Sequence, residues 1–405
     1  MAALKHRNFL LMWVSLLVSN SGTWLQSVAQ DAMIYEMTGR AVDLGLVNVV
    51  RAVALISLAF IGGTIADRVD KRKLIMVTQT LFALLAVVLG ALAQLHIMQV
   101  WHVVVVSFLG SVLLALDQPA RQALVPRLVP REDLMNAIAL NSITFTGAAA
   151  IGPALAVPVI KAFGAPWGFY LNGLSFFAVI IAVYFVKLPP APPRKQTEKV
   201  SEAVRSGLRY IVNTPAILML VILLSVFAFF AIPYQSLLPV FAYKVFGGLD
   251  SLGVLRAAPG WGALAGGFLL ARFSHYRFKD RLVLVGGLGF GLTLIAFTFT
   301  RWLPLALVLL FFVGGLLTIF QSTVQTLMQQ LTSDEMRGRV MSLFAICLIG
   351  MWPLGAGPLS WAADVMGVVQ ATAIWAVVPL LFLGFIFLTR RDLLRRYRGQ
   401  EEKSA

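Results

Sequence analysis

Charged residues are scarce in this sequence. They make up 13% of its 405 residues, whereas 59% are hydrophobic and the mean hydropathy is +0.84. Soluble domains carry about 25% charged residues. A chain of this length with so few polar side chains lacks the polar surface that a water-soluble globule needs. The composition therefore excludes a soluble protein and predicts an integral membrane protein.

Reactive and metal-binding residues are scarce too. The single cysteine, Cys347, excludes an intramolecular disulfide. The four histidines are scattered without metal-ligand spacing, and the absence of a P-loop sequence excludes ATP hydrolysis as the energy source. No serine–histidine or paired-carboxylate arrangement is visible. We therefore expect neither a cofactor nor a bound metal, and we do not expect an enzyme.

Long hydrophobic stretches are what the sequence has in abundance. Because lipid offers no hydrogen-bond partners to the backbone, a chain crosses it as helices of about 20 residues. The expected fold class is therefore an all-α membrane protein with twelve transmembrane helices. We predict these spans at residues 9–36, 42–66, 74–94, 100–120, 135–160, 166–188, 214–240, 249–273, 281–300, 303–328, 338–362 and 367–389.

Basic residues predict the orientation of these spans. With the N-terminus on the inside, the inner segments hold 27 of the 33 Lys and Arg residues, which agrees with the positive-inside rule. The net charge of +15 is then spread over short loops, so it does not indicate a nucleic-acid partner. We expect a multi-pass protein of the cell inner membrane, surrounded by lipids, with both termini in the cytoplasm.

Short sequence patterns recur in the same order in two parts of the chain. The pattern G-G-x-x-x-x-R begins at residue 62 and again at residue 266, and other short matches recur at similar offsets. Such order indicates two tandem six-helix halves. We predict an N-terminal half at 1–187, a cytoplasmic linker at 188–210 with a surface helix from about Glu198, a C-terminal half at 211–389 and a basic cytoplasmic tail at 390–405.

The loop after the second span carries a family motif. Residues 63–72 read GTIADRVDKR, which resembles the signature G-x-x-x-D-R-x-G-R-[RK] of the major facilitator superfamily, with Asp70 in place of the second glycine. The resemblance extends over essentially the whole chain and implies the major facilitator fold. It also implies that Gly63, Asp67, Arg68 and Arg72 form a latch, in which the acid lies near a helix N-terminus and holds one conformation closed.

Within that superfamily the chain resembles the bacterial exporter group that includes the enterobactin exporter. The stretches SNSGTWLQSVAQ at 19–30, DQPARQALVPRLVPREDLMNAIALNS at 117–142 and IGPALA at 151–156 carry the likeness. Gly152 and Pro153 also resemble part of the antiporter signature of the fifth span, G-x-x-x-G-P-x-x-G. The direction of transport, export, is what this resemblance implies.

Charged residues inside the spans are costly and therefore point to function. On the first span Asn20, Trp24, Ser27 and Asp31 form one helical stripe that is able to line a cavity. Asp31 and Arg51 lie at similar distances from the turn between the first two spans, so we expect them to pair. Either this pair only joins two helices, or Asp31 gains and loses a proton during transport.

Other polar residues in the spans have two interpretations each. Asp117 and Arg121, four residues apart, form a gate or a plain structural pair. Arg256 faces an anionic substrate or extends its charge toward the membrane surface. Five neutral polar residues either line a cavity or hold helices together: Asn141, Thr144, Gln235, Gln321 and Gln325.

These observations predict a secondary transporter that works by alternating access, with its site between the two halves. We expect it to act as a monomer and to export a small amphiphilic compound, such as a siderophore or a drug, in exchange for protons that bind Asp31. Two alternatives remain. A lipid or lysolipid flippase of the same fold moves lipid without proton flux, and a membrane receptor or assembly subunit transports nothing.

Overall fold

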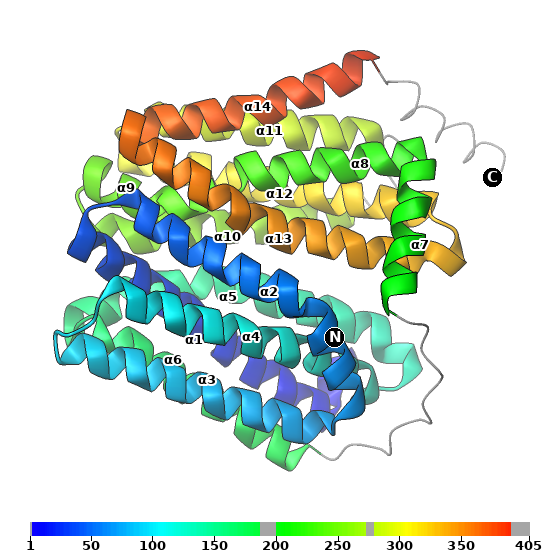
Figure 1. The fold of residues 1–405 in the computed structure, drawn as a ribbon, viewed down its shortest axis with the longest axis horizontal. Helices are drawn as coiled ribbons and strands as arrows, with labels where there is room; N and C mark the ends of the chain where they lie inside the picture. Colours follow the sequence, from blue (N-terminus) through cyan, green and yellow to red (C-terminus); the bar gives the residue numbers. More distant parts are fainter. Residues whose placement is uncertain (1, 187–199, 273–278, 390–405) are drawn as a thin grey trace. The chain divides into compact units, whose positions relative to one another are not determined.

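The computed structural model describes residues 2–186, 200–272 and 279–389, without the side chains of residues 59–68, 200, 201, 203, 204 and 346. The described chain is almost wholly helical and contains no β-strand, which confirms the predicted fold class. The α-helices are α1 (Arg7–Thr38), α2 (Ala41–Arg68), α3 (Lys71–Gln94), α4 (Val100–Leu124), α5 (Leu134–Phe163), α6 (Pro166–Phe185), α7 (Val200–Asn213), α8 (Pro215–Val226), α9 (Tyr234–Val245), α10 (Leu249–Arg272), α11 (Lys279–Phe299), α12 (Leu303–Leu331), α13 (Asp334–Met366) and α14 (Val368–Thr389) (Figure 1). Three 3-10 turns, Ala2–Lys5, Val125–Arg127 and Arg131–Asp133, lie next to α1, α4 and α5.

Eleven segments of the described chain are long and apolar enough to cross a membrane. They correspond to the second to twelfth predicted spans. The first predicted span is α1, whose 32 residues extend over about 48 Å. This helix is long enough to cross a membrane. Polar residues such as Asn20 and Asp31 lower its hydropathy, so it is not one of the eleven apolar segments. The chain is thus a multi-pass membrane protein, and the predicted orientation of its termini stays a prediction.

The seventh predicted span is not one continuous α-helix. It consists of α8, a π-helical turn at Phe227–Ala231 and α9. Pro233 explains the interruption, because it has no N–H to donate to the carbonyl of Phe229 four residues earlier. Gly355 of α13 packs against that carbonyl so closely that a Cβ there would come within 1.9 Å of it. The proline and the glycine together therefore give this span its break.

The chain forms two compact units. The first comprises Met1–Arg194 and Leu238–Gly260, and the second comprises Lys195–Leu237 and Trp261–Ala405. Most of α9 and the first half of α10 therefore belong to the first unit. The predicted bounds of the two six-helix halves stay a prediction, and the predicted tail and the linker up to residue 199 lie outside the described residues.

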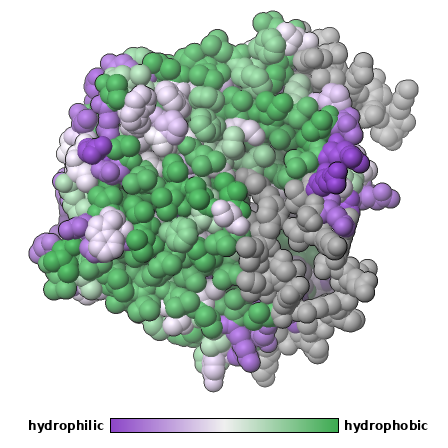
Figure 2. Space-filling model, in the orientation of Figure 1, coloured by the Kyte–Doolittle hydropathy of each residue, from purple (hydrophilic) through white to green (hydrophobic). Residues whose placement is uncertain are grey.

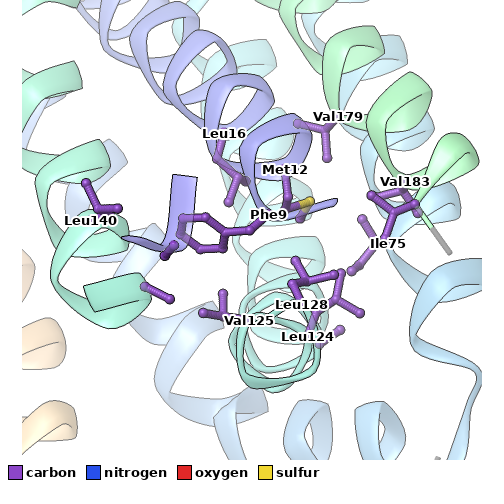
Figure 3. Packing of buried hydrophobic residues seen from close by; sticks show 14 of the residues in the cluster. Phe9, Met12, Leu16, Ile75, Leu124, Val125, Leu128, Leu140, Val179 and Val183 are labelled. Atoms are coloured by element: carbon purple, nitrogen blue, oxygen red, sulfur yellow. The ribbon is translucent and has the colours of Figure 1, made fainter. Parts of the chain in front are cut away.

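In the first unit, α1 packs on α5 and α6, α2 packs on α4, and α3 packs on α4 and α6. A buried apolar cluster near the start of α1 joins α1 to α3, α4, α5 and α6 (Figure 3). Phe9 and Met12 of α1 lie among residues of four other segments, including Leu124, Leu140 and Val179. The hydrophobic stretches thus bury one face of each helix against its neighbours.

In the second unit, α11 packs on α12 and α14, and α13 contacts α7, α14 and the π-helical turn. The short helix α7 occupies the place of the predicted surface helix and lies across the ends of α8 and α13 (Figure 1). A Cβ at Gly207 would come within 3.1 Å of Leu343 Cδ1 and 3.2 Å of Arg339 Cβ on α13, and Ile211 is buried. Helix α7 therefore belongs to the second unit, where it packs on α13 and α8.

Large hydrophobic side chains cover the outer flanks of the helices. Phe268, Leu381 and Leu388 are 67%, 70% and 86% exposed, and Figure 2 shows hydrophobic residues along the helix flanks with hydrophilic residues gathered where helices end. In water such an apolar surface would promote aggregation, whereas in a membrane it faces lipid. The surface therefore agrees with the multi-pass topology.

Candidate functional site

A charge cluster of Gln30, Asp31, Arg51 and Arg256 joins α1, α2 and α10 within the first unit. Nη2 of Arg256 donates to Oδ2 of Asp31, and the two side chains are only 10% and 15% exposed. Asp31 lies seven residues before the end of α1, and Arg256 lies seven residues after the start of α10. Both are thus about 10 Å inside their helix ends. Charges at this depth are costly, which makes the charge cluster the first candidate for function.

The structure differs here from the predicted pair of Asp31 and Arg51. The direct partner of Asp31 is Arg256, whereas Arg51 donates from Nη2 to Oε1 of Gln30 at 3.3 Å. Asp31 and Arg256 are nevertheless close enough to act on Arg51 electrostatically. Since Arg256 is 10% exposed and paired, it does not extend its charge to the membrane surface. Whether it contacts a substrate stays a prediction.

Asp117 lies at the centre of a second polar network, between α3 and α4. Its side chain is fully buried. Oδ1 accepts hydrogen bonds from Thr78 Oγ1 at 2.7 Å and Gln79 Nε2 at 3.1 Å, and Oδ2 faces Arg121 Nε at 2.6 Å. Oδ1 therefore accepts two hydrogen bonds, whereas Oδ2 has the ion pair with Arg121 but no hydrogen bond among the described residues. This arrangement favours the structural interpretation of the Asp117–Arg121 pair over the gate, because a gate residue must exchange partners.

The predicted latch is described only in part. The side chains of Gly63, Asp67 and Arg68 lie outside the described residues, although α2 includes their backbone. Asp70 has φ −58° and caps α3, accepting from the backbone N–H groups of Arg72 at 2.8 Å and Lys73 at 3.1 Å. The acid that replaces the second glycine of the signature thus serves as a helix cap. A left-handed conformation is not needed there.

Arg72 connects α3 to the end of α6. Its Nη2 donates to the carbonyl oxygen of Tyr184, and its guanidinium lies 5.7 Å from the centroid of the Tyr184 ring. We expect Arg72→Gln to lower the free energy of unfolding by about 1 kcal/mol, because the cation–π contact and the hydrogen bond are both lost. Titration with sodium dodecyl sulfate, followed by tryptophan fluorescence, measures this change. Lys73→Gln, one residue away and exposed, is the control; equal effects of both variants would contradict the assignment.

The predicted polar stripe of α1 contacts α5 at Trp24. Asn20, Trp24 and Ser27 are half-buried. The Trp24 ring meets the Phe145 ring of α5 edge-on at 6.2 Å, and the hydroxyl of Ser27 donates to the carbonyl of Trp24 at 2.7 Å. The stripe therefore contributes an aromatic contact as well as polar groups, and its role as a cavity wall stays a prediction.

Two other predicted polar residues belong to α5. Thr144 is buried and donates to the carbonyl of Leu140 at 3.0 Å, so its hydroxyl is used within its own helix. Asn141 is half-buried. In the second unit, Gln235 of α9 and Gln321 of α12 are half-buried and Gln325 of α12 is exposed. Their assignment to a cavity likewise stays a prediction.

Gly152 and Pro153 lie inside α5, which continues through both residues. A Cβ at Gly152 would come within 2.6 Å of the Ser21 carbonyl oxygen and of Trp24 Cβ on α1. On α10, a Cβ at Gly260 would come within 2.7 Å of the backbone nitrogen of Ala150. Glycines therefore allow α5 to approach both α1 and α10, the two helices that carry Asp31 and Arg256.

Sequence reasoning missed three polar members of these sites. Gln30, which binds Arg51, directly precedes Asp31 in the chain. Thr78 and Gln79, which bind Asp117, interrupt the hydrophobic third span. In each case a polar residue inside a predicted span was the available signal. Among the described residues, no group of three His, Cys, Asp or Glu side chains has the arrangement of a metal site.

Comparison with known proteins relates the whole chain to membrane transporters. A family model described as "Transmembrane secretion effector" matches residues 1–403. The staphyloferrin A transporter of Staphylococcus aureus (strain NCTC 8325 / PS 47) is 25% identical over 386 residues, which cover 92% of this chain and 94% of that protein. The enterobactin exporter EntS of Citrobacter koseri is 23% identical over 393 residues, which cover 97% and 94%. The predicted resemblance to the exporter group is thus confirmed.

Solved structures agree on the fold. A bacterial homologue of the human lysosomal transporter Spinster, in an inward-facing and unoccupied conformation, matches with a TM-score of 0.74. The match covers 96% of this chain and 98% of that chain at 16% sequence identity. At this identity the likeness concerns the fold alone.

Proposed function

Because the chain belongs to the transmembrane secretion effector family of the major facilitator superfamily, we propose that it exports a small amphiphilic compound, such as a siderophore or a drug, by alternating access and in exchange for protons. Relatives that match over nine-tenths of its length are named as a transporter and an exporter, which supports transport and favours export. We infer that it is not an enzyme, and that it works as a monomer with both termini in the cytoplasm.

Asp31 is the residue that best supports proton coupling. Its carboxylate is 15% exposed and pairs with Arg256, and it lies inside α1, which we predict to cross the membrane. A proton on Asp31 replaces an ion pair by a weaker hydrogen bond, so protonation changes how firmly α1 is held to α10. Two conformations that differ in this contact then differ in their affinity for the proton, which is the requirement for coupling. Asp117 suits this role less, because its fully buried carboxylate is held by two hydrogen bonds and by the ion pair with Arg121.

Transport by purified protein in liposomes tests this function. The liposomes contain a pH-sensitive dye and start with a pH gradient, and siderophores, drugs and a fluorescent lysolipid are added in turn. We expect at least one siderophore or drug to cross and to dissipate the gradient through the wild type. Asp31→Asn should abolish the proton signal, because the coupling carboxyl is lost. Asp250→Asn, the same change at an exposed acid of α10 that is paired with Lys161, should retain it.

The other possible results of this experiment each support a different function for this protein. If compounds cross and Asp31→Asn dissipates the gradient as the wild type does, export stands and proton coupling through Asp31 does not. Movement of the lysolipid without a proton signal would support the flippase. If no compound crosses through the wild type or any variant, the result would support a receptor or an assembly subunit and not a transporter.

A further inference from the structure

The charge cluster carries more positive than negative charge. Two guanidinium groups, those of Arg51 and Arg256, share a single acid in the cluster, Asp31. The next acid along α1, Glu36, is exposed and accepts a hydrogen bond from Tyr243, and Asp250 of α10 is exposed and pairs with Lys161. Neither Glu36 nor Asp250 therefore neutralises the positive charge of the second arginine in the cluster. With Asp31 ionised, the cluster is left with a net charge of +1 at a depth where water is scarce.

Two hydrogen-bond donors of the charge cluster are also unused. Nε2 of Gln30 and Nε of Arg256 are buried and have no hydrogen-bond partner among the described residues. Gln30 itself is 1% exposed, and its oxygen accepts from Arg51. Buried polar groups are nearly always paired in folded proteins, and those that are not usually await a ligand or a water molecule. The unused groups here are both donors.

An ion pair that only joined two helices would need neither a second arginine nor unused hydrogen-bond donors. One arginine suffices to neutralise Asp31, and a second, half-buried arginine without an acid of its own costs stability. Two guanidinium groups and a carboxamide that converge from three helices are, in contrast, the groups that bind carboxylates, since a guanidinium donates two parallel hydrogen bonds to them. The residues therefore match an acceptor with one negative charge.

We propose that the charge cluster binds a carboxylate of the exported compound through Arg51, Arg256 and the side-chain amide of Gln30. The bound carboxylate brings the cluster to net neutrality and pairs the unused donors. This inference rests on the proposed export and narrows its substrate class to amphiphilic acids, because an excess positive charge repels cationic compounds. It does not depend on the exchange of protons.

Binding of two matched probes tests the inference. Dansylglycine is an amphiphilic fluorescent carboxylate, and dansylglycinamide is its uncharged counterpart. With the full-length protein in phosphatidylcholine nanodiscs, we expect the wild type to bind the carboxylate about tenfold more tightly than the amide, a difference of about 1.4 kcal/mol. Arg256→Gln and Arg51→Gln should each reduce this preference toward equality. Arg40→Gln, the same substitution at an exposed arginine between α1 and α2, should leave it unchanged.

The variant Asp31→Asn shows whether the arginine variants lose carboxylate recognition or simply misfold. It removes the carboxylate that competes for Arg256, so we expect it to bind dansylglycine more tightly than the wild type does, opposite to the arginine variants. Equal affinity of the wild type for the two probes, or binding of neither, would overturn the proposal. The proposal would also be overturned if phosphatidylglycerol in the nanodiscs competes with dansylglycine in the wild type but not in Arg256→Gln. The charge cluster would then bind a lipid headgroup. If the liposome experiment detects export while the probes bind equally, the inference fails and the proposed function stands.

Discussion

Asp117→Ala is expected to lower the free energy of unfolding by about 3–5 kcal/mol, because it removes one partner of a buried ion pair and leaves the other. Asp117 is fully buried, accepts hydrogen bonds from Thr78 and Gln79, and forms an ion pair with Arg121. Alanine provides no acceptor for any of them. The Arg121 guanidinium, 18% exposed, is then left without its carboxylate in a membrane-crossing helix.

Titration of the purified protein with sodium dodecyl sulfate, monitored by tryptophan fluorescence, measures this loss. Asp334→Ala is the matched control, since Asp334 also pairs with an arginine on its own helix, Arg337, but is 87% exposed; we expect no measurable change there. The double variant Asp117→Leu/Arg121→Leu should recover much of the lost stability, because no unpaired charge remains. Comparable effects at Asp117 and Asp334 would show that the buried network does not stabilise the protein.

Gly152→Leu is expected to give the second large effect, at or above the upper end of the roughly 1–3 kcal/mol that overpacking usually costs. The first atom of the new side chain would already lie 2.6 Å from the Ser21 carbonyl oxygen. A backbone atom cannot turn away as a side chain does, so α1 as a whole must move away from α5. Because Asp31 lies on the same helix, we expect transport to be lost together with stability.

The same denaturant titration, run beside the liposome assay, checks this prediction. Gly147→Ala, in the same helix, is the control, because a Cβ at Gly147 meets nothing within 4 Å among the described residues. It should be neutral or should stabilise α5 by up to about 1 kcal/mol, since alanine is the better helix former. Equal destabilisation by both variants would mean that α5 tolerates no side chain at either position, and that the contact with α1 is not the cause.

The membrane-crossing helices were predictable because their formation is local. Inside lipid each segment pairs its own backbone groups, so the length of a hydrophobic stretch sets the length of its helix. The predicted span 166–188, for example, is α6 at Pro166–Phe185. The interruption in the seventh span depends on Pro233 together with a distant residue, Gly355. That contact has no local signal, and a single helix was therefore expected.

The members of the charge cluster were predictable only in part. Charge inside a hydrophobic stretch identified Asp31, Arg51 and Arg256 as candidates, and residue counting placed Asp31 and Arg51 at comparable depths. Depth does not determine which face of a helix a side chain occupies or which helices are neighbours. Asp31 and Arg256 are 225 residues apart in the chain, and only the packing of α10 in the first unit brings them into contact.

Hydropathy was enough to predict that this protein crosses the membrane many times as helices, and short motifs were enough to predict its family. Both properties depend on residues close together in the chain, because hydropathy and helix hydrogen bonding act over one segment. The packing of the helices, in contrast, decided that Arg256 pairs with Asp31, and that Thr78 and Gln79 bind Asp117. It also decided that Gly152 lets α5 approach α1. These contacts join segments far apart in sequence, and they depend on how whole helices rotate and pack.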